Sequence, residues 1–367
     1  MPHGEQFWNP YRLIPVRGEV PRRPPRTHER FSGISGWMSC SITNLTPLFI
    51  GGRSSGSQHP PLLRRNRRVI PGASLKGVLR SLVEIVGGGC FVVKDNGSPH
   101  ANQYNACDSV QWLCAGCRMF GMMERGPNAK VHQGNIYIGD APIREERAET
   151  IPLDVLLTHN QLRHQPFYRN PGTHQMDGNN RKLYFHQPKR VESTPPIPAP
   201  IRDRAWRIEA VRAGHHFDFD IHFTNLEEDE LNLLLYALAL EEAVSVQIPS
   251  EETPISLSGP MRHKIGNAKP LGLGSSHIQV QKLTLLAEPR ERFATLSGNL
   301  AETVLEGEAL HGEIQRRTAQ WRNDASPTME ALRKMMVWDE KDPRDFRYPD
   351  YNWFQNPQNA QKPLKPI

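Results

Sequence analysis

Three cysteines lie close together in the chain, at Cys107, Cys114 and Cys117. Two cysteines separated by two residues can chelate one zinc ion, because the intervening turn directs both sulfurs the same way. A tetrahedral site needs a fourth ligand, and its candidates are Cys90, His100 and, more distantly, His132. Cys90 is preferred because four thiolates suit a closed structural site. The pattern predicts a structural zinc ion, and the alternative is a set of buried free cysteines.

A second set of residues suits phosphate. The stretch from Gly51 to Arg80 contains no acidic residue and carries the cations Arg53, Arg64, Arg65, Arg67, Arg68, Lys76 and Arg80. Within it, the segment from Ile70 to Gly77 has the form of a helix start, with Ser74 as its cap. Lys76 and Arg80 then fall four residues apart on the outer face, near free amides that favour phosphate. The pattern predicts a phosphate-binding corner; the alternative is a solvated basic face of an amphipathic helix.

A glycine-rich loop lies late in the chain, between His263 and Ser275. Its glycines allow backbone amides to approach a phosphate or base closely, and its lysines add positive charge. The residues predicted to contact RNA there are Lys264, Asn267, Lys269, Gly272, Gly274 and Ser275. Taken alone, such a loop is often only a turn.

The segment from Arg144 to Arg204 is long and irregular, and structureless loops of this length are uncommon in compact domains. It interleaves cations with flat rings at Arg163, His164, Phe167, Tyr168, Arg169, Arg181, Tyr184 and His186. Such mixtures suit phosphate pairing and base stacking. The alternative is a surface insert whose rings cover the domain.

The composition is consistent with a polyanionic partner. Lys and Arg outnumber Asp and Glu by 45 to 39 in 367 residues. No stretch approaches the roughly 20 apolar residues that span a bilayer, and the N-terminus lacks a signal-peptide core, so we expect no membrane and a cytoplasmic location. In that reducing compartment, clustered cysteines indicate metal binding rather than disulfides.

The elements that must position these residues alternate along the chain. We expect strands over residues 36–50, 135–138, 217–223 and 277–285, a helix from Ser74, and a second helix capped by Asn225 and ending at Leu240. This order fits an α+β, ferredoxin-like or RRM-like split fold with a large mid-chain insertion. Residues 293–321 look helical, and the aromatic tail beyond Val337 either docks on another subunit or folds back on its own domain.

Three segments together resemble the repeat-associated mysterious protein (RAMP) superfamily: Ile70 to Ser81, Cys117 to Gly121, and Lys264 to Ser275. Asn9-Pro10-Tyr11, the run from Leu45 to Gly51, and Asn225-Leu226 resemble more closely the single-RAMP proteins of type III-D-like CRISPR loci. The lack of an aspartate in the loop after the first strand, described below, also gives a resemblance to the backbone subunit of type VII complexes.

The resemblance implies a RAMP domain over residues 1–285, with a ferredoxin-like palm, a zinc insertion at about 88–134 and a thumb hairpin at about 145–205. Residues 286–367 would form a C-terminal helix and an aromatic interaction tail. Copies would polymerise head to tail along a CRISPR guide RNA that pairs with complementary target RNA. The resemblance assigns Ser74, Lys76 and Arg80 to the guide backbone. It also implies two further partners, a RAMP subunit capping the 5′ handle and a separate nuclease or large subunit.

One feature departs from relatives that cut target RNA, which carry an aspartate in the loop after the first strand. Here the first aspartate of the chain is Asp95, well beyond that loop. A neutral side chain cannot supply the anionic oxygen that Mg²⁺-assisted cleavage needs, so we expect a scaffold that does not cleave. The alternative is an endoribonuclease acting on target RNA or guide precursor, with His59 as the acid or base.

Overall fold

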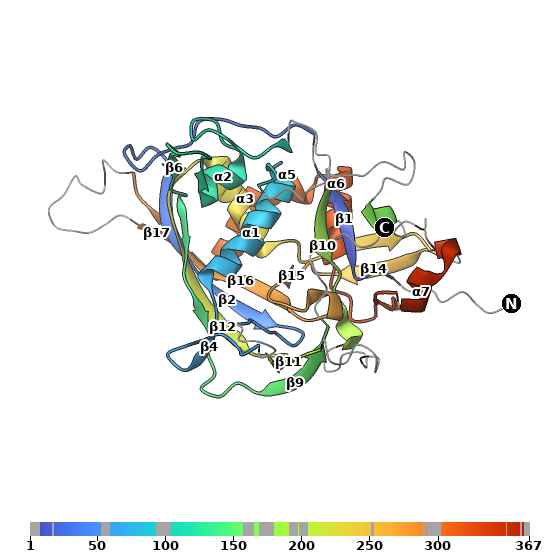
Figure 1. Cartoon of the computed structure of the whole chain (residues 1–367). Coiled ribbons are helices and arrows are strands. Elements are labelled where there is room, and N and C mark those ends of the chain that lie inside the picture. Colours follow the sequence, from blue (N-terminus) through green and yellow to red (C-terminus); the bar gives the residue numbers. More distant parts are fainter. Residues whose placement is uncertain are drawn as a thin grey trace.

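The centre of the fold is an antiparallel sheet whose strands come from distant parts of the chain. A computed structural model describes residues 8–16, 18–52, 59–92, 104–156, 165–168, 180–190, 197, 205–250, 253–288, 291, 302–349, 351–359 and 362. The strands are β2 (Ile34–Asn44), β7 (Ile136–Ile138), β12 (His216–Leu226), β15 (His263–Lys264), β16 (Ser275–Leu286) and β17 (Glu302–Glu306). Their order is β15-β16-β2-β12-β7, and β17 also pairs with β16 (Figure 1). Strand β2 therefore lies between partners from the middle and from the end of the sequence.

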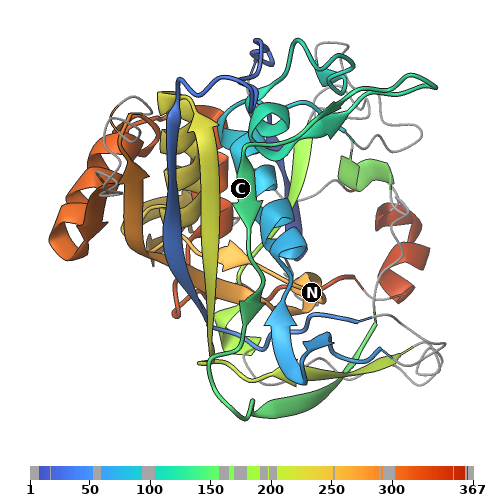
Figure 2. The same cartoon turned by 90° about the vertical axis from the view of Figure 1, so that its left-hand side faces the viewer.

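Two helices, α1 (Gly72–Val86) and α3 (Glu228–Ala239), lie together on one face of this sheet, and Figure 2 looks onto the sheet from the other side. Strand β12 shows why the helices pack there, because every second residue is apolar and buried: Phe217, Phe219, Ile221 and Phe223. Along the chain the main elements run β2, α1, β7, β12, α3, β16. The mixed α/β class is therefore as expected. Among the described residues, no helix is long and apolar enough to cross a membrane.

Helix α1 begins earlier than its sequence indicated. Pro71 is the cap residue and Ser74 lies inside the first turn without a capping hydrogen bond, so the predicted cap is wrong. The first helical residue, Gly72, has to be a glycine, because a Cβ there would lie 2.1 Å from the carbonyl oxygen of Ile138. Its amide donates to the carboxylate of Asp140 at 2.9 Å. The helix start is thus packed directly against the end of β7.

Asn225 was also expected to cap a helix, and it does not. The cap of α3 is Glu227, which forms a capping box with Glu230. Asn225 instead has φ 59°, and its side-chain oxygen accepts from the amides of Ser32 and Gly33 at 2.9 and 2.7 Å. The side chain therefore ties the N-terminal segment to the end of β12.

Shorter elements fill the segments between the sheet strands. They are β3 (Leu63–Arg64), β4 (Arg67–Ile70), α2 (Ala115–Phe120), β5 (Met122–Met123), β6 (Val131–His132), β8 (Ala141–Pro142), β13 (Val244–Ile248), β14 (Ile255–Gly259), and the 3-10 turns η2 (Gln165–Tyr168), η3 (Pro188–Arg190) and η5 (Lys269–Leu271). Strand β9 (Thr150–Val155) pairs with β11 (Trp206–Val211), and β10 (Asn180–Tyr184) pairs with β1 (Tyr11–Pro15). The mid-chain insertion thus leaves and rejoins the domain through the β9–β11 ribbon.

The C-terminal region is more ordered than expected. Residues 302–306, which were expected to be helical, form β17, and helix α5 (Gly307–Arg322) follows it. Helices α6 (Pro327–Met336) and α7 (Tyr351–Gln355) and the turn η6 (Pro357–Asn359) come next. Phe346 pairs with Trp8 and stacks on Phe185 with ring centroids 4.9 Å apart. This part of the tail folds back on its own domain.

Candidate metal centre and nucleic-acid interface

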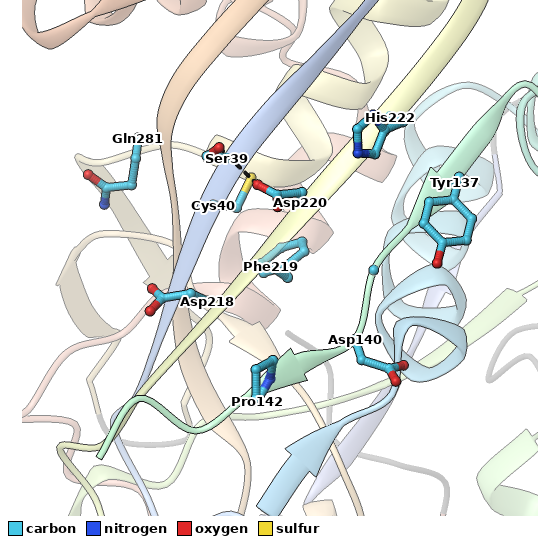
Figure 3. A pocket seen from close by; sticks show the side chains of 11 residues that line it. Ser39, Cys40, Tyr137, Asp140, Pro142, Asp218, Phe219, Asp220, His222 and Gln281 are labelled. Atoms are coloured by element: carbon cyan, nitrogen blue, oxygen red, sulfur yellow. Dashed lines mark hydrogen bonds between the residues drawn. The ribbon is translucent and has the colours of Figure 1, made fainter. Parts of the chain in front are cut away.

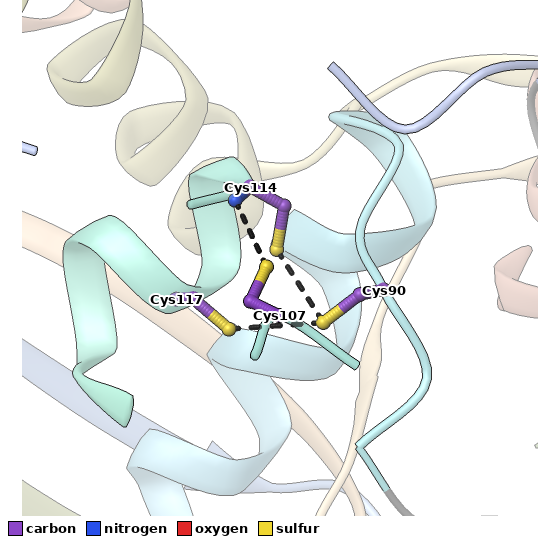
Figure 4. A group of neighbouring side chains, drawn as sticks. All are labelled: Cys90, Cys107, Cys114 and Cys117. Atoms are coloured by element: carbon purple, nitrogen blue, oxygen red, sulfur yellow. Dashed lines mark hydrogen bonds between the residues drawn. The ribbon is translucent and has the colours of Figure 1, made fainter. Parts of the chain in front are cut away.

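Four cysteines meet where α1 ends and α2 begins (Figure 4). The sulfur atoms of Cys90, Cys107, Cys114 and Cys117 all lie within 4.8 Å of one another, and all four side chains are buried. The Cys90 sulfur lies 3.7 Å from those of Cys114 and Cys117. A tetrahedron with zinc–sulfur bonds of about 2.3 Å has edges of about 3.8 Å, so these residues fit a zinc ion. The preference for Cys90 as fourth ligand is in agreement with this cluster.

The two histidine alternatives do not compete with Cys90 in the described structure. His100 lies outside the described residues. His132 is buried, and its Nε2 lies 2.9 Å from the carbonyl oxygen of Arg118 rather than in the sulfur cluster. Hydrogen bonds from Cys114, and then from Cys117 and Cys90, hold the pKa of the Cys107 thiol far below its usual value. The cluster therefore favours at least one thiolate even before a metal binds.

Arg80 belongs to this centre, which corrects its expected place on an RNA-facing surface. Its Nη2 donates to the sulfur of Cys117 at 3.3 Å, its Nη1 donates to the carbonyl oxygen of Gly121, and its Nε pairs with Glu84 at 2.8 Å. Four thiolates around Zn²⁺ carry a net charge of about −2, which a neighbouring guanidinium offsets. The guanidinium would thus orient a ligand and offset part of that charge.

Arg181, predicted as a thumb residue, also reaches the metal centre. It pairs with Glu84 at 2.7 Å and donates to the carbonyl oxygens of Gly89 and Cys90 at 3.1 and 2.7 Å. Glu84 is buried and so joins two arginines from distant segments. A second buried pair, between Arg118 and Glu230 at 2.6 Å, ties α2 to α3. Arg80 and Glu84 are four residues apart on α1, whereas neither the Glu84–Arg181 pair nor the Arg118–Glu230 pair follows from local sequence.

The basic segment before α1 forms the β3–β4 hairpin. Its turn is made by Arg65 and Asn66, both with positive φ, and Arg64, Arg65 and Arg67 are exposed. Arg64 pairs with Asp140, and Arg68 pairs with Glu209 at 3.0 Å. Asp140 is a carboxylate that the sequence order did not place beside this hairpin. Arg53 lies outside the described residues.

The glycine-rich loop packs on the segment that leads out of β2. Gly274 donates to the carbonyl oxygen of Pro47 at 2.9 Å, and Asn267 donates to that of Phe49 at 2.9 Å. The ammonium of Lys264 donates to the carbonyl oxygens of Gly272 and Leu273 at 3.0 Å each. Burial lowers the pKa of Lys264 well below its usual value, with a smaller contribution from the neighbouring charge of Lys269. Lys264 therefore holds the loop in shape.

Two lysines near these motifs remain as candidate phosphate ligands. Lys76 on α1 and Lys269 in η5 have no carboxylate partner within the described ranges. Burial lowers the pKa of both ammonium groups, and the charge of Arg80 lowers that of Lys76 further. Asn267 is exposed beside Gly51. Partly desolvated cations without a counter-ion are suited to an anionic ligand.

Ser275 and His186 are buried together. The hydroxyl of Ser275 lies 2.8 Å from Nδ1 of His186, and Nε2 of His186 lies 2.9 Å from the carbonyl oxygen of Arg262. Both residues are almost fully enclosed, at 0 and 3% exposure. His186 was expected to contact RNA from the thumb, and its burial shows a role in the core instead. Ser275 likewise presents no surface to a ligand.

His59 stacks on Trp206 of β11, with ring centroids 3.2 Å apart and planes at 15°. Its Nε2 is buried and makes no hydrogen bond. One ring face and one nitrogen are thus covered by the domain itself. This contact gives His59 a packing role that its sequence position did not suggest.

A pocket of about 570 Å³ lies on the open face of the sheet, away from α1 and α3 (Figure 3). Its carboxylates are engaged within the chain, since Asp218 pairs with Arg144 and Asp220 accepts from the hydroxyl of Ser39 at 2.8 Å. The hydrogen bond from Arg144 holds the pKa of Asp218 below its usual value. These carboxylates would repel phosphate, so we do not place RNA on this face.

Comparison with known families identifies the chain. A sequence profile of the RAMP superfamily matches residues 41–252, which is more than half of the chain. The chain belongs to the RAMP superfamily. Membership supports a CRISPR-associated role, with CRISPR RNA and other effector subunits as partners. No curated protein matches this RAMP chain.

The remaining thumb residues of this RAMP protein are placed only in part. Arg163, His164 and Arg169 lie outside the described residues, and Tyr168 is described only through its backbone in η2. Phe167 is buried, with its ring centroid 5.8 Å from that of Trp353. Tyr184 pairs with Tyr11 across the β1–β10 ribbon. Both Phe167 and Tyr184 thus have ring contacts within the domain, and their stacking on bases stays a prediction.

We expect the folding stability of this RAMP protein to decrease at acid pH because of the buried His263. Burial lowers the pKa of this histidine from 6.5 to about 4, and only its Nε2 has a partner, the carbonyl oxygen of Ala237 at 2.8 Å. The unfolded chain takes up the proton first, so the stabilisation is present above pH 6.5 and is lost as the pH falls toward 4. We expect His263→Gln to reduce the slope of unfolding free energy against pH, by up to about 1.4 kcal/mol per pH unit.

Denaturant titrations across this pH window measure that slope. His222→Gln, on the exposed face of β12, is the matched control and should keep the slope of the unmodified protein. Equal slopes for His263→Gln and the unmodified protein would show that His263 does not cause the acid sensitivity.

Proposed function

We propose that this chain is a guide-RNA-binding backbone subunit of a CRISPR effector, related to the type III-D-like single-RAMP proteins or to the type VII backbone subunit. The observation that supports this most is the docking of the glycine-rich loop on residues 47–51, from which the basic hairpin and the start of α1 continue. The glycine-rich loop, which is distant in sequence, then borders the segment that leads into the contiguous hairpin and helix start. Lys76 and Lys269, which have no carboxylate partner among the described residues, suit a phosphate backbone.

The palm, zinc and thumb assignments support the same proposal. The chain order β2-α1-β7-β12-α3-β16 with the sheet order β16-β2-β12-β7 is that of a split β-α-β unit, which we assign as a ferredoxin-like palm. The buried four-cysteine cluster would hold a structural zinc ion, because its thiolates leave no open position for a substrate. The β9–β11 ribbon would carry the thumb. Copies of the chain would then assemble head to tail along the guide and display it to target RNA.

Guide binding is tested with purified protein and RNAs of increasing length. We expect light scattering to show complexes that grow by one 41.7 kDa chain at a time as the RNA lengthens. Lys76→Met should weaken binding and reduce the slope of log affinity against log salt by about 0.7, the loss of one phosphate contact. Lys130→Met, on an exposed turn, is the control. Absence of RNA binding would overturn the proposal, and a single chain per RNA at every length would exclude the filament.

We further propose that the subunit does not cleave RNA. The described part of the loop after β2 contains no carboxylate, and Asp140, which approaches the hairpin, is held by Arg64 and the amide of Gly72. Labelled target RNA bound to the guide complex should remain intact without an added nuclease. Discrete cuts at regular spacing that disappear in His59→Ala would instead establish the endoribonuclease alternative.

A further inference from the structure

Arg12 on β1 is a buried cation without a hydrogen-bond partner. The side chain is 4% exposed, and none of its three guanidinium nitrogens makes a hydrogen bond. Arg12 lies opposite Leu183 of β10, so its side chain leaves the ribbon on the same face as Ile14 and Arg181. That face is turned toward the body of the domain, where Ile14 is part of the main core.

Burial and a second arginine near Arg12 both destabilise its positive charge. Burial lowers the pKa of Arg12 to about 9, the nearby phenol of Tyr11 raises it, and the charge of Arg344 lowers it further. Asp342, the carboxylate bound by Arg344, accepts from Nε and Nη2 of that side chain and leaves its buried Nη1 unpaired. Asp342 is thus bound by Arg344, and no hydrogen bond joins it to Arg12. Among the described residues, two guanidiniums and one carboxylate leave an excess positive charge at neutral pH.

An unpaired buried charge is among the most unfavourable features that a fold can contain. Arginine cannot relieve it by losing its proton at neutral pH, since even the lowered pKa lies above 7. A compensating anion is the remaining way to stabilise the charge. The planar guanidinium donates two parallel N–H bonds to the oxygens of a phosphate, which makes phosphate the best-matched class of anion.

We propose that Arg12, supported by the free Nη1 of Arg344, is a binding site for a phosphate oxyanion. The phosphate comes either from an RNA backbone or from inorganic phosphate in solution. The first source rests on the guide-binding function proposed above, whereas the second does not. Because the nitrogens are enclosed, the anion enters through a local rearrangement. The segment that would move is the C-terminal one that carries Arg344, whose guanidinium lies over the rings of Trp8, Phe185 and Phe346.

The test compares the unmodified protein with Arg12→Met, which replaces the charge by an apolar chain of similar length. Inorganic phosphate should raise the melting temperature of the unmodified protein by roughly 2–4 °C over chloride at equal ionic strength. Arg12→Met should show no such rise, and without phosphate it should melt no lower than the unmodified protein. Arg316→Met, at an exposed arginine of α5, should keep the full phosphate response.

Measuring guide-RNA affinity for the same variants distinguishes the two sources of phosphate. If the backbone occupies the site, Arg12→Met lowers guide affinity about tenfold and reduces its salt dependence, while Arg316→Met does not. A phosphate response without any RNA binding would support the site and overturn the proposed function instead. Intact RNA binding with equal phosphate responses in Arg12→Met and the unmodified protein would overturn the site alone.

A folding defect in Arg12→Met is also informative. If that variant melts far below the unmodified protein with and without phosphate, Arg12 has a partner inside the chain and the site is overturned. If it does not fold at all, Arg12→Lys takes its place, because lysine keeps the charge and lacks the bidentate fork. A phosphate response of the unmodified size in Arg12→Lys would then overturn the proposal.

Discussion

Cys117→Ser is expected to release zinc and to cause a large loss of stability. Cys117 lies in α2, its sulfur receives the hydrogen bond from Arg80, and its neighbours Cys90 and Cys114 are almost fully buried. Structural zinc contributes an apparent binding free energy of about 10–16 kcal/mol in small zinc-binding peptides, and that energy is folding energy. Losing one thiolate from a buried set of four forfeits much of it. A strong chelator should act in the same direction on the unmodified protein.

The measurements are zinc content per chain by elemental analysis and melting temperature by calorimetry. Cys40→Ser is the matched control, because Cys40 is equally buried but lies in β2 outside the cluster. It should retain one zinc ion per chain and lose only about 1–3 kcal/mol for a hydroxyl buried in the core. A Cys117→Ser protein with full zinc content and an unchanged melting temperature would contradict a metal centre at these residues.

Gly274→Ala is expected to distort the glycine-rich loop and to abolish guide binding. Gly274 has φ 80°, and a Cβ there would lie 1.9 Å from the carbonyl oxygen of Ile265. Positive φ costs an alanine roughly 1–2 kcal/mol, and the backbone contact adds to this because neither chain segment can yield. We expect a total destabilisation above about 3 kcal/mol, in the range that single substitutions seldom reach. The shifted loop would lose its hydrogen bonds to Pro47 and Phe49 and would no longer hold Lys269 beside residues 47–51.

Gly214→Ala isolates the effect of the close contact. Gly214 also has positive φ, at 90°, yet a Cβ there meets no atom within 4 Å. This variant should lose only the backbone term of about 1–2 kcal/mol and should bind guide RNA normally. Chemical denaturation and RNA titration measure the two effects. Similar results for the two variants would mean that the approach of Gly274 to Ile265 does not shape an RNA-binding loop.

The metal ligands could be predicted from the sequence because their chemistry is encoded by residue type. Few side chains other than cysteine suit a closed zinc site, and Cys90 precedes the other three in the same insertion. The residues that support the ligands were not predictable in this way. Glu84 lies inside an amphipathic helix, and its second partner, Arg181, is 97 residues away. Only the folded chain brings these charges together.

The same limit explains why several expected RNA contacts proved to have partners inside the chain. Arg80 and His186 occupy positions where cations and rings usually face solvent, so their types indicated a nucleic-acid surface. Each has instead a specific internal partner, the Cys117 sulfur for Arg80 and the Ser275 hydroxyl for His186. The predicted helix caps were wrong for a more local reason. Ser74 and Asn225 are good capping residues by type, but Pro71 and Glu227 occupy the positions where the backbone turns into the helix.

The position of β2 between β12 and β16 has a consequence for how the protein is made on the ribosome. Met38 pairs with Leu283, so one edge of an early strand stays open until almost four fifths of the chain has been synthesised. The cysteine cluster closes a far shorter loop, from Cys90 to Cys117, and loop closure is less costly at short separation. Metal capture can therefore organise the nascent chain long before the sheet is complete. A ribosome stalled before β16 would display a folded knuckle beside an exposed strand edge, which is a substrate for chaperones.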